Sequence, residues 1–250
     1  MGNVTIDSEM PSNALAHAAH ASSLTYSFTN TAGTMLIVAA SANASNTQDT
    51  NPLTTPAITG VTYNGVAMTK IGTLDRNSVA TPQCEETFWY LANPANGANN
   101  VVVTASAAYW GLISGALSVT NATIPGNVVS KANDANATTE SVAVNGTLAS
   151  SMIVAYMATG TGYTSTSQTL SASLNFSSHT GGDNAALTRT PGTGGTVTMS
   201  DVTSSDVGGM LAMEIFSSSA YVPGPGSALL TGLAGKLGSG LIPGCMIAGT

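Results

Sequence analysis

The histidines of this chain are too few and too clustered to support nucleophilic hydrolysis. A serine nucleophile needs a tight turn, usually Gly-x-Ser-x-Gly, with a histidine and a carboxylate beside it. No such motif occurs, and the histidines are His17, His20 and His179. Two of the three fall within the first 20 residues, ahead of the first strongly strand-like segment. The sequence therefore predicts no serine-type triad.

The carboxylates do not form the facing pair, about 5–10 Å apart, that glycoside hydrolysis requires. Glu85 and Glu86 are adjacent in a predicted strand, so they point to opposite faces. Glu214 lies between Met213 and Ile215, where burial would raise its pKa. The period-two geometry of that strand instead favours an outward side chain for Glu214. We therefore predict that the chain is not an enzyme.

Metal and cofactor sites are not predicted either. His17 and His20 are three residues apart, as helical ligands can be, but no cysteine or third histidine accompanies them. Several loops are rich in oxygen donors, but none has the spacing of a known calcium loop, and such residues usually form turns. The donor pairs are Asp134 and Asn136, Asp183 and Asn184, and Asp201 and Asp206.

One group of aromatic residues could bind a glycan. Sugars stack on exposed aromatic rings, and Tyr109 and Trp110 fall in a predicted loop that Tyr163 could join. The alternative, which we weigh more heavily, is that Trp110 plugs the end of a β-sandwich, because large aromatic side chains tend to be buried.

Charge is scarce, and this limits the classes of partner. Only 7% of the residues are charged, the net charge is −7, and the five basic residues are scattered. Nucleic-acid binding needs clustered lysine and arginine, so we exclude it. A surface of Ser, Thr, Asn, Ala and Gly gives little colloidal repulsion. Such a surface favours a protein that packs against copies of itself or against another assembly.

Targeting and redox signals are weak. Residues 1–7 lack the basic and apolar regions of a secretory signal, and no apolar run approaches the roughly 20 residues of a membrane-spanning helix. We expect synthesis in a cytoplasm. Cys84 lies beside a predicted core strand and Cys245 in a terminal tail, so we expect two thiols rather than a disulfide.

Alternating and β-branched runs predict an all-β fold. Residues 85–93 and 101–105 are predicted to form the central hairpin of a β-sandwich, with a turn rich in Asn and Gly between them. Asn64-Gly65 between two alternating runs predicts a second hairpin, because both turn positions need positive φ. Further strands are predicted at residues 24–28, 35–40, 111–119, 141–144, 152–156, 170–176, 196–199 and 210–216.

Composition divides the chain into three parts. Residues 1–23 are Ala-rich and weakly amphipathic, which predicts an N-terminal arm. Residues 24–220 form the β-sandwich body, with a pseudo-repeat of 24–121 and 128–219 around a linker at 121–126. Residues 221–250 form a Gly/Leu-rich tail whose glycines disfavour an isolated helix. A leucine every fourth residue should contact a neighbouring subunit, a membrane or its own domain, in that order of preference: Leu229, Leu233, Leu237 and Leu241.

The strand pattern resembles a known structural module. Residues 58–68, 88–94, 101–104 and 115–119 together resemble a jelly-roll-like β-sandwich found in bacteriophage structural proteins and some bacterial surface proteins. The resemblance covers roughly residues 24–219 and is more specific in the first half. It implies a structural role in a virion, with no catalytic residues and no cofactor.

These observations lead to three hypotheses. The first is a virion structural protein, a capsid decoration or minor capsid protein that forms homo-oligomers and contacts other virion proteins. The second is a carbohydrate-binding or adhesive module of a tail fibre or cell surface. The third is a polysaccharide depolymerase. The fold class does not choose among them, because sandwiches host all three.

Overall fold

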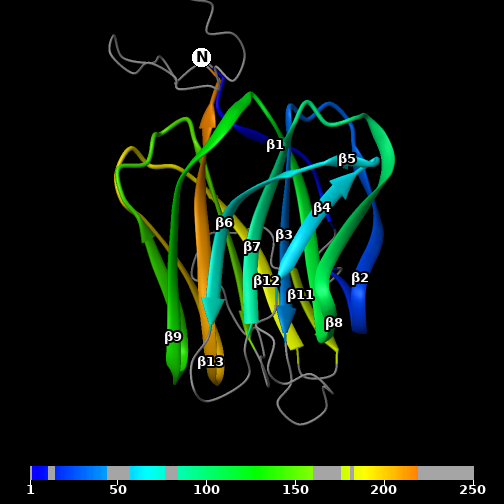
Figure 1. The fold of residues 1–250 in the computed structure, drawn as a ribbon. Coiled ribbons are helices and arrows are strands. Elements are labelled where there is room, and N and C mark those ends of the chain that lie inside the picture. Colours follow the sequence, from blue (N-terminus) through cyan, green and yellow to red (C-terminus); the bar gives the residue numbers. More distant parts are fainter. Residues whose placement is uncertain are drawn as a thin grey trace, which may run out of the picture.

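The structure is a computed structural model that describes residues 2–10, 15–43, 57–76, 84–159, 176–180 and 183–218. This part of the chain is all-β and contains no helix, hence none long and apolar enough to cross a membrane. Its thirteen strands form two antiparallel sheets (Figure 1). The predicted all-β class is confirmed.

The first sheet has eight strands in the order β5-β4-β8-β3-β7-β6, with β1 and β2 paired to β8 as well. β8 is its longest strand, and most of the other strands pair with it. The strands are β1 (Thr5–Glu9), β2 (Ala16–Asn30), β3 (Met35–Asn43), β4 (Ile58–Tyr63), β5 (Val66–Ala67), β6 (Thr69–Arg76), β7 (Cys84–Ala92) and β8 (Gly97–Thr120).

The first sheet curls until its two ends nearly meet. β5 and β6 stand at opposite ends of the strand order, yet only Met68 separates them along the chain. The backbone N–H of Met68 donates to the Val61 carbonyl over 2.9 Å, which holds this junction against β4. Curling of this kind brings the β5 and β6 ends of the sheet together and lets one sheet enclose a core of its own.

The second sheet begins directly after the first one ends. It has the strand order β11-β12-β10-β13-β9. Asn121 alone separates β8 from β9 and has a φ of +56°, a conformation that asparagine tolerates better than most residues. The predicted linker at 121–126 is therefore wrong. The strands are β9 (Ala122–Val144), β10 (Met152–Thr159), β11 (Phe176–Thr180), β12 (Asp183–Pro191) and β13 (Val197–Ser217).

The two sheets pack face to face around a shared apolar core. The ring of Phe88 on β7 meets Tyr156 on β10 edge to face, with 6.4 Å between ring centroids. Gly115 on β8 leaves space for the Leu187 side chain of β12. Buried side chains of both sheets belong to one continuous cluster. The described residues therefore form one folded body rather than two separate halves.

The two sheets share a strand order. In the first, β2-β8-β3-β7-β6 are neighbours, and in the second β9-β13-β10-β12-β11 are neighbours in the corresponding sequence. The additional β4–β5 hairpin of the first sheet has no counterpart in the second. β6 approaches β9, and β2 approaches β11, so the first strand of each set lies near the last strand of the other. A sequence repeat at 24–121 and 128–219 stays a prediction.

The hairpin at Asn64-Gly65 is confirmed, but the predicted central hairpin is wrong. Asn64 and Gly65 have φ values of +50° and +74° between β4 and β5. β7 and β8 do not pair with each other, because β3 lies between them and pairs with both. The connection after β7 crosses the start of β3, where the Asn93 N–H donates to the Thr34 carbonyl over 2.8 Å.

The predicted N-terminal arm belongs to the sheet. β1 and the first half of β2 both pair with β8, so this segment adds an edge to the body. Arg189 of β12 donates from Nε to a Glu9 carboxylate oxygen over 3.0 Å, which ties the segment to the second sheet. The weak amphipathicity misled the prediction, because an Ala-rich edge strand has little apolar contrast between its faces. The tail at 221–250 lies outside the described residues.

Candidate functional site

The predicted glycan contacts do not form an exposed aromatic platform around Tyr109. Tyr109 lies within β8, is 2% exposed, and its hydroxyl is 2.6 Å from Ser106 Oγ. Trp110 lies in the same strand, so the loop expected at this point is wrong. β8 continues through these residues because it follows the curl of the sheet. Tyr163 lies outside the described residues.

The predicted assembly contacts in the C-terminal tail are not among the described residues. The four tail leucines, Leu229, Leu233, Leu237 and Leu241, and Cys245 are outside the described residues. Cys84 begins β7 and is buried, as expected for a residue beside a core strand.

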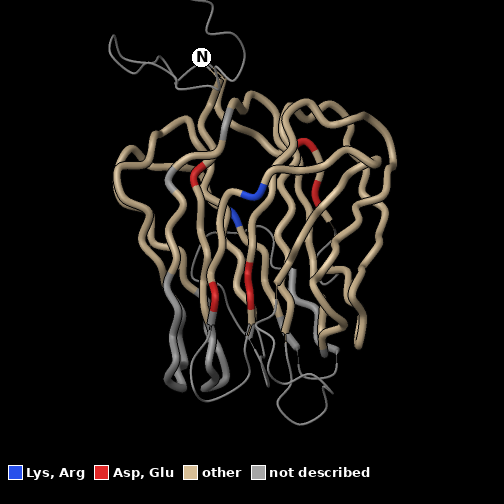
Figure 2. Tube along the Cα trace, viewed as in Figure 1, with Lys and Arg blue, Asp and Glu red and all other residues tan. Residues whose placement is uncertain are grey.

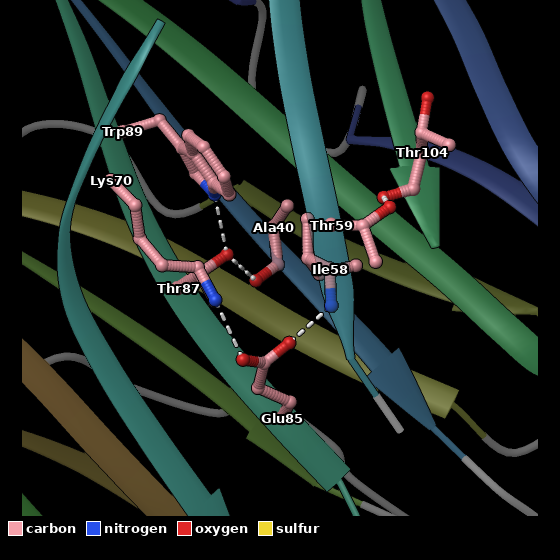
Figure 3. A network of polar contacts seen from close by, with 8 residues as sticks. All are labelled: Ala40, Ile58, Thr59, Lys70, Glu85, Thr87, Trp89 and Thr104. Atoms are coloured by element: carbon pink, nitrogen blue, oxygen red, sulfur yellow. Dashed lines mark hydrogen bonds and ion pairs between the residues drawn. The ribbon is translucent and has the colours of Figure 1, made fainter. Parts of the chain in front are cut away.

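The first polar network joins three strands of the first sheet around Glu85 (Figure 3). Glu85 projects from β7 and is 4% exposed. One of its carboxylate oxygens is 2.8 Å from Lys70 Nζ on β6, and the other accepts the backbone N–H of Ile58 at the start of β4. The carboxylate therefore holds the start of β4 against β6 and β7, where the curled sheet approaches itself.

Aromatic and hydroxyl groups continue this network along β7. Lys70 Nζ lies 5.4 Å from the ring centroid of Trp89, within range of a cation–π contact. Trp89 Nε1 donates to Thr87 Oγ1 over 2.9 Å, and Thr87 Oγ1 donates to the Ala40 carbonyl of β3 over 3.0 Å (Figure 3). Each of these polar groups has a partner inside the sheet, which is the arrangement of a structural clamp.

A second polar cluster lies between the two sheets. The Tyr156 hydroxyl of β10 is 2.9 Å from Ser41 Oγ of β3 and 3.4 Å from the Ile113 carbonyl that accepts from it. Burial raises the pKa of Tyr156 well above its ordinary value, and the neighbouring Glu86 and Cys84 raise it further, although the Ser41 hydrogen bond lowers it. The phenol therefore stays protonated and acts as a hydrogen-bonding bridge between the sheets.

Glu214 points inward, contrary to the prediction. It is fully buried, and one carboxylate oxygen accepts the Leu148 N–H over 2.7 Å. Alternate residues of β13, such as Met213, face the core that the sheets share, while Ala212 faces a smaller apolar cluster. The last residues of β9 and the first residues of β13 curl over that second face of β10 and bury it. Alternation identified the face of Glu214 but could not show that this face was covered.

The described residues contain no group of three histidine, cysteine, aspartate or glutamate side chains that could hold a metal ion. His17 and His20 lie in β2, so the helical spacing that made them a candidate pair does not apply. Burial lowers the pKa of His17.

Asp7 fastens β1 to the turn after β2. Its carboxylate accepts the N–H groups of Thr31 and Ala32 and the Ser118 hydroxyl, each over 2.9 Å. Burial alone would raise the pKa of Asp7, but these hydrogen bonds outweigh it and leave the pKa below 3.8. The stabilisation is therefore fully present above pH 3.8 and is lost as the pH falls through the lowered pKa.

We expect Asp7→Asn to reduce the free energy of unfolding at neutral pH, with a difference from the parent that shrinks below pH 3.8. Urea unfolding across the acidic range measures this difference. Asp75→Asn, at an exposed position of β6, is the matched control and should leave the free energy of unfolding at neutral pH close to that of the parent. A difference that stays constant to the lowest pH would contradict the role given to Asp7.

The outer side of β2, β8 and β4 forms a broad surface without charge, which we call the neutral face. The register places Thr25 beside Val102 and Thr62, and Ser27 beside Asn100, while most of the alternate residues are buried beneath them. We define this face by the following side chains: Ser23, Thr25, Ser27, Thr29, Thr62, Asn64, Ala98, Asn100, Val102 and Thr104.

The neutral face holds a shallow depression of about 400 Å³ beside the Asn64-Gly65 turn. The residues that line it include Asn64, Asn99, Asn100 and Thr62. Asn99 Nδ2 donates to the buried Tyr63 hydroxyl over 3.2 Å, which fixes the amide in place. Amide and hydroxyl groups offer both donors and acceptors, so the depression suits an uncharged polar ligand or a neutral protein surface.

Comparison of the chain with protein-family models, curated proteins and solved structures finds no match.

Most of the charged side chains that the structure describes hold the fold together. Asp7, Glu85 and Glu214 accept hydrogen bonds within the body, Glu86 is fully buried, and Glu9 pairs with Arg189. Figure 2 shows how few segments of the described trace carry a charge at all. The sequence was already poor in charge, and the structure turns several of the remaining charges inward. The part of the exterior formed by described side chains is consequently more neutral than the composition alone implies.

Proposed function

We propose that this chain is a virion structural protein, a capsid decoration or minor capsid protein. It is made in the host cytoplasm and assembles through its low-charge surface and its C-terminal tail. The observation that supports this function best is the neutral face, which spans three strands without a lysine, arginine, aspartate or glutamate. The jelly-roll-like character of the curled sheets belongs to the same proposal.

The physical basis of this proposal is the free energy that surface groups lose when a partner removes their hydration. The cores of protein interfaces are depleted in charged residues, because a buried charge must lose its hydration. Threonine, serine and asparagine lose less on burial and can exchange water for hydrogen bonds with a partner. A body whose acids are engaged internally can be covered on its neutral face without that penalty, as a subunit of a particle must be.

The proposed partners are copies of the same chain and other virion proteins. Because residues 5–9 pair within the sheet, the N-terminal segment is engaged within its own body. The extension left to reach a neighbour is the tail at 221–250, with its leucines.

The test is the location of the protein in its native particle. We expect antibodies raised against the purified chain to label intact virus particles produced by cells that carry the gene. Mass spectrometry of the same particles should recover peptides from this chain in a fixed ratio to the major capsid protein. Particles that contain no copy of the chain would refute the proposal.

The depression on the neutral face favours carbohydrate binding as a second candidate function. Neutral saccharides are recognised by amide and hydroxyl groups such as those of Asn64 and Asn100. We expect any glycan-array signal to fall at least tenfold in Asn100→Ala and to persist in Val66→Ala, an exposed change on the adjacent strand. No signal on the array, or a signal that Asn100→Ala leaves unchanged, would remove this function.

A further inference from the structure

β2 has an open edge in the described part of the chain. One side of β2 pairs with β8 along most of its length, and no described strand pairs with its other side. In Figure 1, β2 stands at the margin of the fold, with no described strand beyond it. Its exposed residues contrast with β3, which pairs on both sides and is buried throughout. Along Ser23–Thr29 this edge presents backbone N–H and C=O groups that no described strand pairs.

This edge lacks the features that usually prevent pairing. Edge strands are commonly protected by charged residues, by proline or by being very short. β2 has 15 residues and contains no charged residue and no proline. The strands at the margins of the second sheet differ, since β9 contains Pro125, Lys131 and Glu140, and β11 has only five residues. The contrast marks β2 as a long edge without protection.

The segment from Ser23 to Thr29 is suited to pair with itself. It alternates inward residues Leu24, Tyr26 and Phe28 with exposed hydroxyl residues, and its register with β8 is uninterrupted. An antiparallel pair of identical strands centred on Tyr26 sets Leu24 opposite Phe28 of the second copy, and Thr25 opposite Ser27. Cross-strand pairs of this kind stabilise sheets, and an uncharged strand brings no like-charge repulsion to the two-fold axis.

We propose that β2 is an assembly edge that pairs antiparallel with β2 of a second copy of this chain and joins their neutral faces into one continuous surface. This inference rests on the proposed function, because it names the partner and the geometry of the assembly. The chain's own tail fits the edge poorly, since residues 221–250 are rich in glycine and contain three prolines, which strands disfavour.

The test uses paired charge variants of the full chain. In Thr25→Glu/Ser27→Glu and in Thr25→Lys/Ser27→Lys, like charges face each other across the two-fold axis. Both residues are exposed, so each variant should fold, which equilibrium unfolding checks. Thr25→Ser/Ser27→Thr is the neutral control. Sedimentation velocity, taken up to about 1 mM, then reports self-association of each protein.

We expect the parent and the neutral control to self-associate, and each charged variant to associate at least tenfold more weakly. An equimolar mixture of the acidic and basic variants should regain association, because opposite charges then meet at the same edge. This recovery does not depend on the exact register. A parent that stays monomeric throughout, a charged variant that associates like the parent, or a mixture without recovery would each overturn the inference.

The results remain separable from those for the proposed function. If charged variants associate like the parent and the chain is still found in particles, β2 is not the assembly edge, but the virion role stands. A third outcome is a monomeric parent that enters particles while the charged variants do not. The strand that pairs with β2 would then come from another virion protein, and pairing with a second copy would be refuted. If the charge effects appear but particles lack the chain, the edge inference holds and the virion role fails.

Discussion

Phe88→Ala is expected to lower the free energy of unfolding by about 3–5 kcal/mol, the range for removing a buried phenylalanine side chain. Phe88 is fully buried on β7 and meets the Tyr156 ring of the opposite sheet. Its loss leaves a cavity at the junction of the two sheets, which the surrounding strands can fill only in part. Equilibrium unfolding in urea, followed by circular dichroism and by tryptophan fluorescence, measures the effect.

The same experiment tests whether the sheets unfold together. Because Phe88 contacts both sheets, Phe88→Ala should shift one cooperative transition rather than separate it into two. Val66→Ala is the matched control, since Val66 is 52% exposed on β5 and its truncation should change stability by less than about 0.5 kcal/mol. Two transitions in the parent, with only the earlier one moved by the substitution, would contradict the shared core.

The strands that the sequence predicts best are those whose signal is local. Asn64 and Gly65 predict a hairpin because their positive φ values are a property of the turn itself. The apolar run after Gly33 predicts β3, because a strand that is paired on both edges and covered on both faces has few polar residues. These features depend on a few neighbouring residues, so a single sequence carries them.

Pairing partners were harder to predict, because they depend on the path of the whole chain. β7 and β8 are joined by a short Asn/Gly-rich connection, which is the usual mark of a hairpin, yet β3 separates them. The decisive contacts come from distant residues: Asn30 Nδ2 donates to the Pro94 carbonyl over 3.2 Å and helps to hold the connection across β3. No pattern within residues 85–105 contains that information.

The candidate site shows a similar limit. Charge scarcity could be counted from the sequence, but the sequence could not show that the remaining acids are turned inward. Glu85, Glu86 and Glu214 all lie in strands buried on both faces, where alternation no longer separates inside from outside. Alternation did find Thr25 and Ser27 as exposed positions between buried residues. It could not show that these positions join residues of β4 and β8 in one surface.

A substitution in the clamp around Glu85 is expected to cause the other large loss of stability. Lys70→Met should reduce the free energy of unfolding by about 2–3 kcal/mol, because it leaves the Glu85 carboxylate buried without its cation. This is less than the roughly 3–5 kcal/mol expected for a fully buried pair, since the Lys70 side chain is 33% exposed and water can screen the charge.

The double variant Lys70→Met/Glu85→Gln distinguishes a buried charge from lost packing. Glutamine can still accept the Ile58 N–H but carries no charge, so the double variant should regain most of the stability that Lys70→Met loses. Glu85→Gln alone should cost less than Lys70→Met, because the Lys70 ammonium can reach water. Urea unfolding of all four proteins gives the coupling energy. A double variant as unstable as the sum of the two single variants would mean that the two charges act independently, and it would contradict the role given to the Lys70–Glu85 pair in the clamp.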